Sequence, residues 1–382
     1  MAQTQCIGDL SLGSSCGGGG GGTTVPVNLP LSGTIATAQV ASSSITVTNA
    51  TLAPGAHLYI GAGNGIDGDQ ELIVLNTYDA LGQLEKKKVG GAATANVYLA
   101  PGLQQVDFKY NIRGWLKTIN EDAFADNDLF NFTIKYNDIA DVTKKLYNGN
   151  ISQTQWNTLS QVTGANPISN TYTYTYDALN RITGAVDNTN NYTVGNITYD
   201  KNGNILTLNR NGHQGGSTFT GMDALNYAYD SGNKLMKVAD LGNDAHGFID
   251  DAVNIADVAD DYAYDQNGNM VSDANKGITA IAYNHLNLPK QITVSGTNNG
   301  TISYIYDATG AKLRKNVLTN GASAPTATDY AGNYLYENNQ LQFFSTPEGY
   351  VTPNTLGGYD YIYQYKDHLG NVRLSYMQDP GN

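Results

Sequence analysis

The histidines of this 382-residue chain are the first candidates for chemistry, because imidazole is a common metal ligand and proton carrier. They are His57, His213, His246, His285 and His368. No H-E-x-x-H, C-x-x-C or paired His-Cys spacing occurs, and no G-x-S-x-G or Walker loop is present. The sequence therefore predicts no zinc site and no nucleophilic catalytic centre of a familiar type.

The aspartates offer two further kinds of chemistry. DKNGN (200–204) and DQNGN (265–269) gather carboxylate and amide oxygens on short turns, and such oxygens are ligands for Ca²⁺. A calcium loop also needs a glycine at its sixth position and a late glutamate, which both stretches lack. An aspartic dyad needs two carboxylates that meet in space, and the sequence does not identify such a pair. Turn capping explains these aspartates better, so we predict no catalytic residue, no metal ligand, no cofactor and no enzymatic activity.

Most of these aspartates belong to a heptad that recurs along the chain: Tyr-Asp, two variable residues, Gly or Asn, one variable residue, and an apolar residue. YDALGQL (78–84), YDALNRI (176–182) and YDKNGNI (199–205) are examples. The aspartate would accept backbone N–H groups ahead of it, and the Gly or Asn supplies a positive φ. Each heptad therefore predicts the turn of a β-hairpin. The residues assigned to these turns are Tyr78, Asp79, Gly82, Tyr110, Gly114, Tyr176, Asp177, Asn180, Tyr199, Asp200, Gly203, Tyr229, Asp230, Tyr264, Asp265, Gly268, Tyr306, Asp307 and Gly310.

The segments that flank the heptads alternate between apolar and polar residues, as in TYTYTYDALNRITGAV (171–186). One hairpin is marginal in water, so a row of hairpins must share one sheet, with a Tyr/Leu/Ile face and a Thr/Asn/Lys face. A sheet of that length twists and coils. The predicted fold is all-β: a long spiralling antiparallel sheet that forms a shell or an open arc. The spacing of the heptads is too irregular for a propeller.

Composition divides the chain into four predicted parts. Residues 1–22 end in six glycines and are interpreted as a flexible tail, which holds Cys6 and Cys16 as either one local disulfide or two free thiols. Residues 23–75 are rich in Thr, Ser and Val and predict a small β-roll-like module. Residues 76–360 are the hairpin strip, and residues 361–382 form a distinct C-terminal segment.

The net charge and the hydropathy of the chain argue against two kinds of partner, nucleic acid and the membrane interior. The net charge of −13 repels phosphate, so nucleic acid is not expected as a partner. No apolar run approaches the length of about 18 residues that a membrane span needs. We expect a secreted or cell-surface protein. No signal peptide is visible at the start, so its leader would lie outside this numbering, or its export would follow a non-classical route.

The heptads resemble the YD repeats of Rhs-type and teneurin-type proteins over about residues 71–382, and several stretches are similar to Rhs-repeat proteins of Bacteroidetes-like bacteria. The stretches that carry this resemblance are VDFKYNIRGWLKTIN (106–120), KKLYNGNISQTQW (144–156), YDALNRITGAV (176–186), ITAIAYNHLNLPKQITV (278–294), DYAGNYLYENNQLQFFSTPEGYV (329–351) and YIYQYKDHLGNVRLSY (361–376). In the last stretch, Asp367, Gly370 and Arg373 match the D-x-x-G-x-x-R pattern at the start of the Rhs-associated core.

The resemblance implies a β-strip that spirals into a hollow shell, which in bacteria commonly encloses a C-terminal toxin. It also implies a core that often acts as an aspartyl autoprotease. The sequence stops at MQDPGN, before the motifs that would complete such a protease. We therefore expect residues 361–382 to be only the start of that core.

Three functions remain open at this point. The first is a non-enzymatic structural protein that builds a shell or a self-assembling surface scaffold. The second is a truncated toxin carrier, whose partner is a downstream or encapsulated polypeptide. The third is a carbohydrate or cell-contact module, in which tyrosine rings stack on sugars.

Overall fold

The computed structural model describes residues 58–61, 70–91, 102–121, 128–159, 167–250, 259–296 and 299–378. The glycine-rich tail, both cysteines and most of the predicted 23–75 module lie outside the described residues. The division of the chain into four parts stays a prediction, although one strand, β2 (Gln70–Tyr78), runs across position 75.

Strands make up more than half of the described residues, and they form two sheets. The first sheet contains β1 (Leu58–Gly61), β2 (Gln70–Tyr78), β3 (Leu84–Val89), β4 (Gln104–Tyr110), β5 (Leu116–Ile119), β6 (Phe130–Lys135), β7 (Gln153–Thr158), β8 (Ile168–Tyr176), β9 (Ile182–Asp187), β10 (Val194–Tyr199), β11 (Ile205–His213), β12 (Phe219–Tyr229) and β13 (Leu235–Asp240). The second contains β14 (Tyr262–Tyr264), β15 (Met270–Asp273), β16 (Ile278–Tyr283), β17 (Pro289–Val294), β18 (Gly300–Tyr306), β19 (Lys312–Thr319), β20 (Thr326–Ala331), β21 (Tyr334–Glu337), β22 (Gln340–Thr346), β23 (Gly349–Pro353), β24 (Tyr359–Lys366) and β25 (Val372–Tyr376). One short 3₁₀ helix, η4 (Val142–Lys144), lies between β6 and β7.

Within each sheet, every strand pairs antiparallel with the strand that follows it in the sequence. The predicted all-β fold built from antiparallel hairpins is therefore confirmed. The heptads join even-numbered strands to the odd-numbered strands that follow, so their turns lie along one edge of the strip.

The strip is interrupted once, between β13 and β14, where the prediction had one continuous sheet. Asp261 spans this interruption: its N–H donates to the Met236 carbonyl at 2.9 Å, and its Oδ2 accepts the N–H of Val238 at 2.7 Å. The Tyr264 hydroxyl also donates to the carbonyl of Leu235 at 2.7 Å. The two sheets are therefore joined by hydrogen bonds, although the ladder between them is incomplete.

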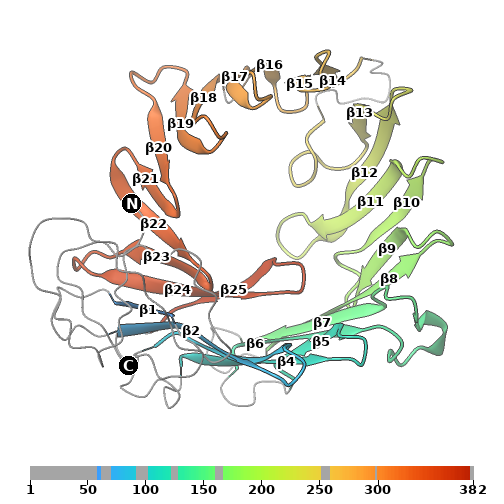
Figure 1. Cartoon of the computed structure of the whole chain (residues 1–382). Helices are drawn as coiled ribbons and strands as arrows, with labels where there is room; N and C mark the ends of the chain where they lie inside the picture. The colour runs from blue at the N-terminus through green and yellow to red at the C-terminus, as the bar shows by residue number, and fades with distance from the viewer. Residues whose placement is uncertain are drawn as a thin grey trace, which may run out of the picture.

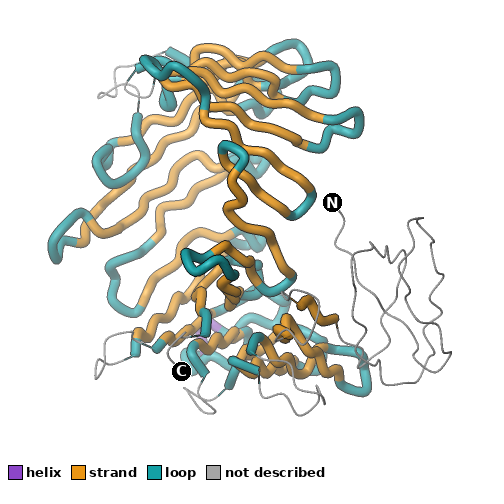
Figure 2. The backbone as a smooth tube through the Cα atoms, turned by 90° about the vertical axis from the view of Figure 1, so that its left-hand side faces the viewer, coloured by secondary structure: helices purple, strands orange, loops and turns teal. Residues whose placement is uncertain are grey.

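The strip curves until its end lies over its beginning, as Figure 1 shows from the blue strands to the red strands. Figure 2 shows the same arch from the side. The register shifts at the first residue of the heptads, for example between Thr175 and Tyr176 and between Ile305 and Tyr306. Each shift is a bulge that increases the local twist, and repetition along one edge bends the whole strip.

The main core lies where the two ends overlap. Its buried members come from β3–β6 with the segment after β6, and from β24: Val89, Val106, Ile119, Phe130, Phe132, Ile134, Tyr136, Tyr363 and Tyr365. In contrast, the described residues from 274 to 327 include no buried side chain. Within the described part of the chain, no helix is long and apolar enough to span a membrane.

Candidate functional site

The heptad turns have one common geometry, which Asp177 illustrates. Its Oδ1 accepts the N–H groups of Leu179 at 2.8 Å and Arg181 at 2.9 Å. Its own N–H donates to the Arg181 carbonyl at 2.9 Å, and Asn180 has a φ of 63°. The carboxylate therefore occupies the inside of a tight turn, and the fifth residue adopts the left-handed conformation that closes the hairpin.

The other predicted turn residues take the same positions. Aspartate oxygens accept the same two N–H groups at Asp79, Asp200, Asp230, Asp265, Asp307 and Asp367. Asn111 and Asn284 take the place of the aspartate in two further turns. Positive φ angles occur at Gly82, Gly114, Gly203, Gly268, Gly310 and Gly370. The oxygens that the sequence offered to Ca²⁺ are thus hydrogen-bonded to the turn itself.

Hydrogen bonds also lower the pKa of the turn aspartates and so keep them charged. The N–H of Arg181 and its guanidinium hold the pKa of Asp177 below its ordinary value, against a smaller opposing effect of burial. The pKa of Asp200 is lowered in the same way, because bonds from Asn204 and its neighbours outweigh the larger single effect of burial. These aspartates are therefore ionised acceptors at neutral pH, which suits a structural role.

The tyrosine that begins each heptad has a role that sequence reasoning missed. In six of these tyrosines the hydroxyl donates to the carbonyl of the apolar residue that follows the preceding turn. These bonds join Tyr176 to Ile151, Tyr199 to Ile182, Tyr229 to Ile205, Tyr264 to Leu235, Tyr283 to Met270 and Tyr306 to Pro289. Tyr78 instead accepts a bond from Asn76 at 3.3 Å. The fixed separation of tyrosine and apolar residue in every heptad was the signal for this link between successive hairpins.

Neighbouring turns also touch one another through side chains. Asn202 and Asn204 of one turn both donate to Oδ1 of Asn233 in the next, each at 2.8 Å. Arg181 places its guanidinium 4.4 Å from the centre of the Tyr199 ring, in the following hairpin. The turn edge is therefore a connected row, with each turn held by the one beside it.

The overlap of the two chain ends is the candidate functional site, because it closes the strip into one circuit (Figure 1). The Tyr363 hydroxyl donates to Glu71 at 2.6 Å, across 292 residues of sequence. The Tyr365 hydroxyl donates to Oε1 of Gln104 at 2.8 Å. Both tyrosines are almost fully buried, and burial raises the pKa of each well above its ordinary value. We call this overlap the closure; it comprises β2–β7 on one side and β22–β25 with their connections on the other.

Rings and charges extend the closure beyond these hydrogen bonds. Lys87 and Glu348 form an ion pair of 2.5 Å in which both side chains are largely buried. The ring of His368 stacks on Phe132 at 5.5 Å, and the guanidinium of Arg373 lies 5.0 Å from the centre of the Trp156 ring.

The residues assigned to the C-terminal motif all lie in the β24–β25 hairpin, which packs on the first strands at the closure. They are Asp367, Gly370 and Arg373. Asp367 forms the turn, and Arg373 Nε donates to its Oδ2 at 2.9 Å. Burial acts to raise the pKa of Asp367, but the bonds from Asn371, Leu369 and Arg373 together lower it. The Asp367 carboxylate is thus saturated by its own hairpin, and Arg373 is held where its guanidinium meets Trp156.

The closure also contains a partly buried imidazole, that of His368. Its Nδ1 is buried without a hydrogen-bond partner among the described residues. Burial lowers the pKa of His368 most strongly, Asp367 raises it and Arg373 lowers it. The neutral imidazole is therefore the form that fits between Phe132 and the hairpin.

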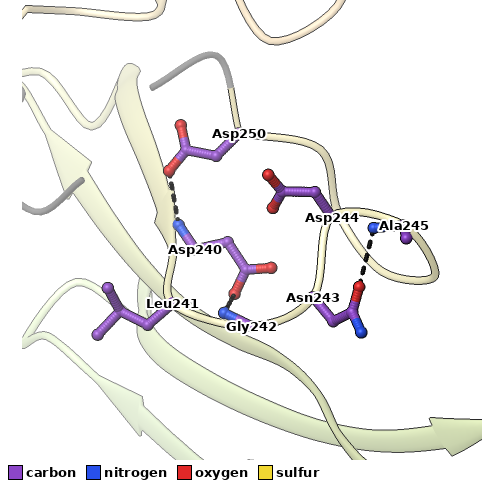
Figure 3. Close-up of a pocket in the computed structure, with 7 residues that line it drawn as sticks. All are labelled: Asp240, Leu241, Gly242, Asn243, Asp244, Ala245 and Asp250. Carbon is purple, nitrogen blue, oxygen red and sulfur yellow. Dashed lines mark hydrogen bonds between the residues drawn. The ribbon is translucent and has the colours of Figure 1, made fainter. Parts of the chain in front are cut away.

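A separate pocket of about 430 Å³ lies beside the loop that follows β13 (Figure 3). Its polar lining includes Asp240, Asn243, Asp244 and Asp250. Oδ1 of Asp240 accepts the Gly242 N–H at 2.9 Å, and Oδ2 of Asp250 accepts the Asp240 N–H at 2.9 Å. These bonds shape the loop, and no group of three or more metal-ligating side chains that could hold an ion occurs in the described part of the chain.

No family model matches this sequence, and no curated protein matches it. The search of solved structures does find matches. One is a chain of the TcdB2–TccC3–TEV crystal structure, with 13 % identity and a TM-score of 0.43 over 81 % of this chain. Another is a chain of the Photorhabdus luminescens Tc holotoxin pore with a TccC3 mutation, with 14 % identity and a TM-score of 0.44 over 83 % of this chain. This chain spans only 17 % and 18 % of the length of those two chains.

Proposed function

We propose that this chain is a non-enzymatic structural protein that forms one closed circuit of a β-wall. The observation that carries the proposal is the closure, in which the last hairpin buries Tyr363 and Tyr365 against the first strands. A strip that served only to present loops would not need its two ends to share a core.

The hydrogen bonding and protonation of the polar side chains support a structural role. The turn aspartates are used as acceptors within their own hairpins, and the heptad tyrosines donate to the neighbouring hairpin. Burial raises the pKa of Tyr172 to about 12, so its hydroxyl keeps its proton at neutral pH. A nucleophile or general base needs the opposite adjustment of its pKa.

We further propose that the wall encloses or supports another polypeptide, outside the cell or at its surface. The curvature of the strip supports this, because an arch presents a concave side that a flat sheet lacks (Figures 1 and 2). The proposal adds no ligand and no cofactor.

Electron microscopy of the purified full chain tests this role. We expect closed, ring-like particles for the native chain and open, extended ones for a Tyr363→Ala/Tyr365→Ala variant, which loses the closure contacts. Extended particles in the native chain would contradict the proposal. A hydrolytic activity that a single substitution abolishes would contradict its non-enzymatic part.

A further inference from the structure

The arc from β10 to β19 lies opposite the closure (Figure 1), and we call it the opposite arc. Its last four strands carry a row of apolar side chains on one face. Ile281 lies opposite Ile292, which in turn lies opposite Ile302. Ile302 lies opposite Val317, and residues that lie opposite one another share one face of a sheet. All four side chains are only partly buried, so no second layer of the described chain covers the row.

The corresponding face is covered in the closure. Ile302 stands four residues before Tyr306, the first residue of its heptad, and Val106 stands four residues before Tyr110. Val106 is 2 % exposed and belongs to the core that β24 completes, whereas Ile302 is only partly buried. The strip therefore presents the same face in both regions, and a hairpin lies on that face only in the closure. We call the uncovered face of β16–β19 the open face.

A lysine lies over an aromatic ring at the same heptad position in both regions. In the closure, Nζ of Lys87 lies 5.7 Å from the centre of the Phe108 ring. On the open face, Nζ of Lys312 lies 5.2 Å from the centre of the Tyr304 ring. Lys87 is also paired at 2.5 Å with Glu348, which the covering layer supplies, and Lys312 has no ion pair among the described residues. The open face therefore lacks the carboxylate that the closure receives from its second layer.

Two more lysines give the open face its charge. Lys315 lies opposite Tyr304, and Lys290 alternates along β17 with the isoleucine of the row. Neither lysine forms an ion pair within the described part of the chain. Glu337 shares the face, but it lies two strands beyond Lys315 in register. Residues 274–327 contain five basic side chains and one acidic one, a net charge of +4, although the whole chain carries −13.

We propose that the open face binds an acidic segment of a partner polypeptide. Its apolar side chains cover the row, and its carboxylates pair with Lys290, Lys312 and Lys315. The covering layer of the closure shows the same combination, since it brings buried tyrosines and Glu348 to the corresponding face. A nucleic acid or an anionic membrane would meet the negative charge of the remaining chain. The inference rests on the proposed function, because it gives the chemistry of the polypeptide that the wall supports.

Calorimetric titration of the full chain with two synthetic peptides tests the open face. In the acidic peptide, Ile and Thr alternate between a pair of Glu residues at each end, and in the neutral peptide Gln replaces every Glu. We expect a dissociation constant of roughly 10–100 µM for the acidic peptide. The neutral peptide should bind at least roughly 10-fold more weakly, because it offers no charge to the three lysines. Equal affinities, or no binding of the acidic peptide up to roughly 1 mM, would overturn the proposal.

A pair of charge variants locates the binding. Lys290→Glu/Lys315→Glu reverses the charge beside the row and should weaken binding of the acidic peptide by at least roughly 30-fold. Lys144→Glu/Lys201→Glu changes the net charge equally at two exposed lysines outside the open face and should keep the native affinity. Circular dichroism spectra of both variants should match the native spectrum, because none of the four lysines is buried. Equal losses in the two variants would show only a long-range effect of net charge and would overturn the proposal.

Hydrogen exchange and two other anionic probes complete the test. The acidic peptide should slow amide exchange in β16–β19, and slowing confined to other strands would contradict the proposed site. We expect no binding to vesicles of phosphatidylglycerol and phosphatidylcholine or to single-stranded DNA. Binding to either one that Lys290→Glu/Lys315→Glu abolishes would assign the face to a membrane or a nucleic acid and overturn the proposal. Ring-like particles by electron microscopy without peptide binding would overturn this inference and leave the proposed wall intact.

Discussion

Strands β3–β7 and strands β16–β19 are built with the same heptad turns, yet they differ in what covers them. The first group lies beneath the C-terminal hairpin, and its Phe130 and Phe132 have no exposed surface. The second group has no buried side chain among its described residues. The heptad therefore specifies hairpins and their links, whereas a core arises only where a second layer lies on the first.

The largest expected difference between the two regions is in free energy of unfolding. Phe132→Ala removes a ring from the closure and should lower the free energy of unfolding by about 3–5 kcal/mol. Ile305→Ala, at a side chain that is 50 % exposed, should lower it by less than about 1 kcal/mol. Chemical denaturation of both variants measures this, and equal losses would show that the closure is not the main core.

Two glycines with positive φ, Gly90 in the closure and Gly203 on the opposite arc, should differ in their tolerance of an added Cβ. A Cβ on Gly90 would lie 2.8 Å from Cε2 of Tyr363 and 2.9 Å from Cδ1 of Leu103, and its φ is +77°. Gly90→Ala should therefore cost roughly 2–4 kcal/mol, from steric overlap added to backbone strain.

Gly203→Ala provides the matched case on the opposite arc. Its φ is +93°, but nothing lies within 4 Å of the added Cβ, so strain alone should cost about 1–2 kcal/mol. Thermal unfolding of the two variants compares them. If Gly90→Ala is no worse than Gly203→Ala, Tyr363 does not pack where the structure places it.

The hydroxyl links between hairpins have a smaller expected effect, and they matter most where no second layer helps. Tyr306→Phe removes the bond to the Pro289 carbonyl, which is 2.9 Å long, and should cost about 0.5–1.5 kcal/mol. Tyr304→Phe, two residues earlier on the same strand, is the control and should be nearly neutral. Urea denaturation midpoints distinguish the two variants. Identical midpoints would show that the hydroxyl bond of the heptad tyrosine does not stabilise the strip.

The smallest expected difference between the two regions is in how their stability responds to acid. The pKa of His368 is below its ordinary value of 6.5 in the folded chain, so the open or unfolded state takes up a proton first. The stability of the closure should therefore fall as the pH falls below 6.5. The pKa of Asp200 and its counterparts is also lowered, so the stability that they contribute persists above 3.8 and is lost as the pH falls below it.

The two tryptophans of the chain, Trp115 and Trp156, both lie in the closure, so their fluorescence reports on that region. We expect it to change as the pH falls below 6.5, while far-ultraviolet circular dichroism stays constant as long as the pH is above 3.8. His368→Phe keeps the stacked ring on Phe132 and removes the titration, so it should abolish the first change. A change that survives in this variant would assign the acid sensitivity to another group.

The residues that predicted the fold acted locally. Asp177, its two bonded N–H groups and the positive φ of Asn180 lie within five consecutive residues, so the turn was visible as a pattern. The hydroxyl bond from Tyr199 to Ile182 was not predicted, because it spans 17 residues and depends on which hairpin lies beside which. The interruption between β13 and β14 was likewise unseen, since the heptads continue on both sides of it.

The sequence alone determined the hairpins, their antiparallel order and the edge on which their turns lie, because turn chemistry and period-2 alternation are short-range properties. Only the tertiary structure decided that Tyr363 meets Glu71 and that Phe132 meets His368. Those contacts depend on the accumulated twist of the strands between them, and a small bend at each bulge decides whether the two ends of the strip meet.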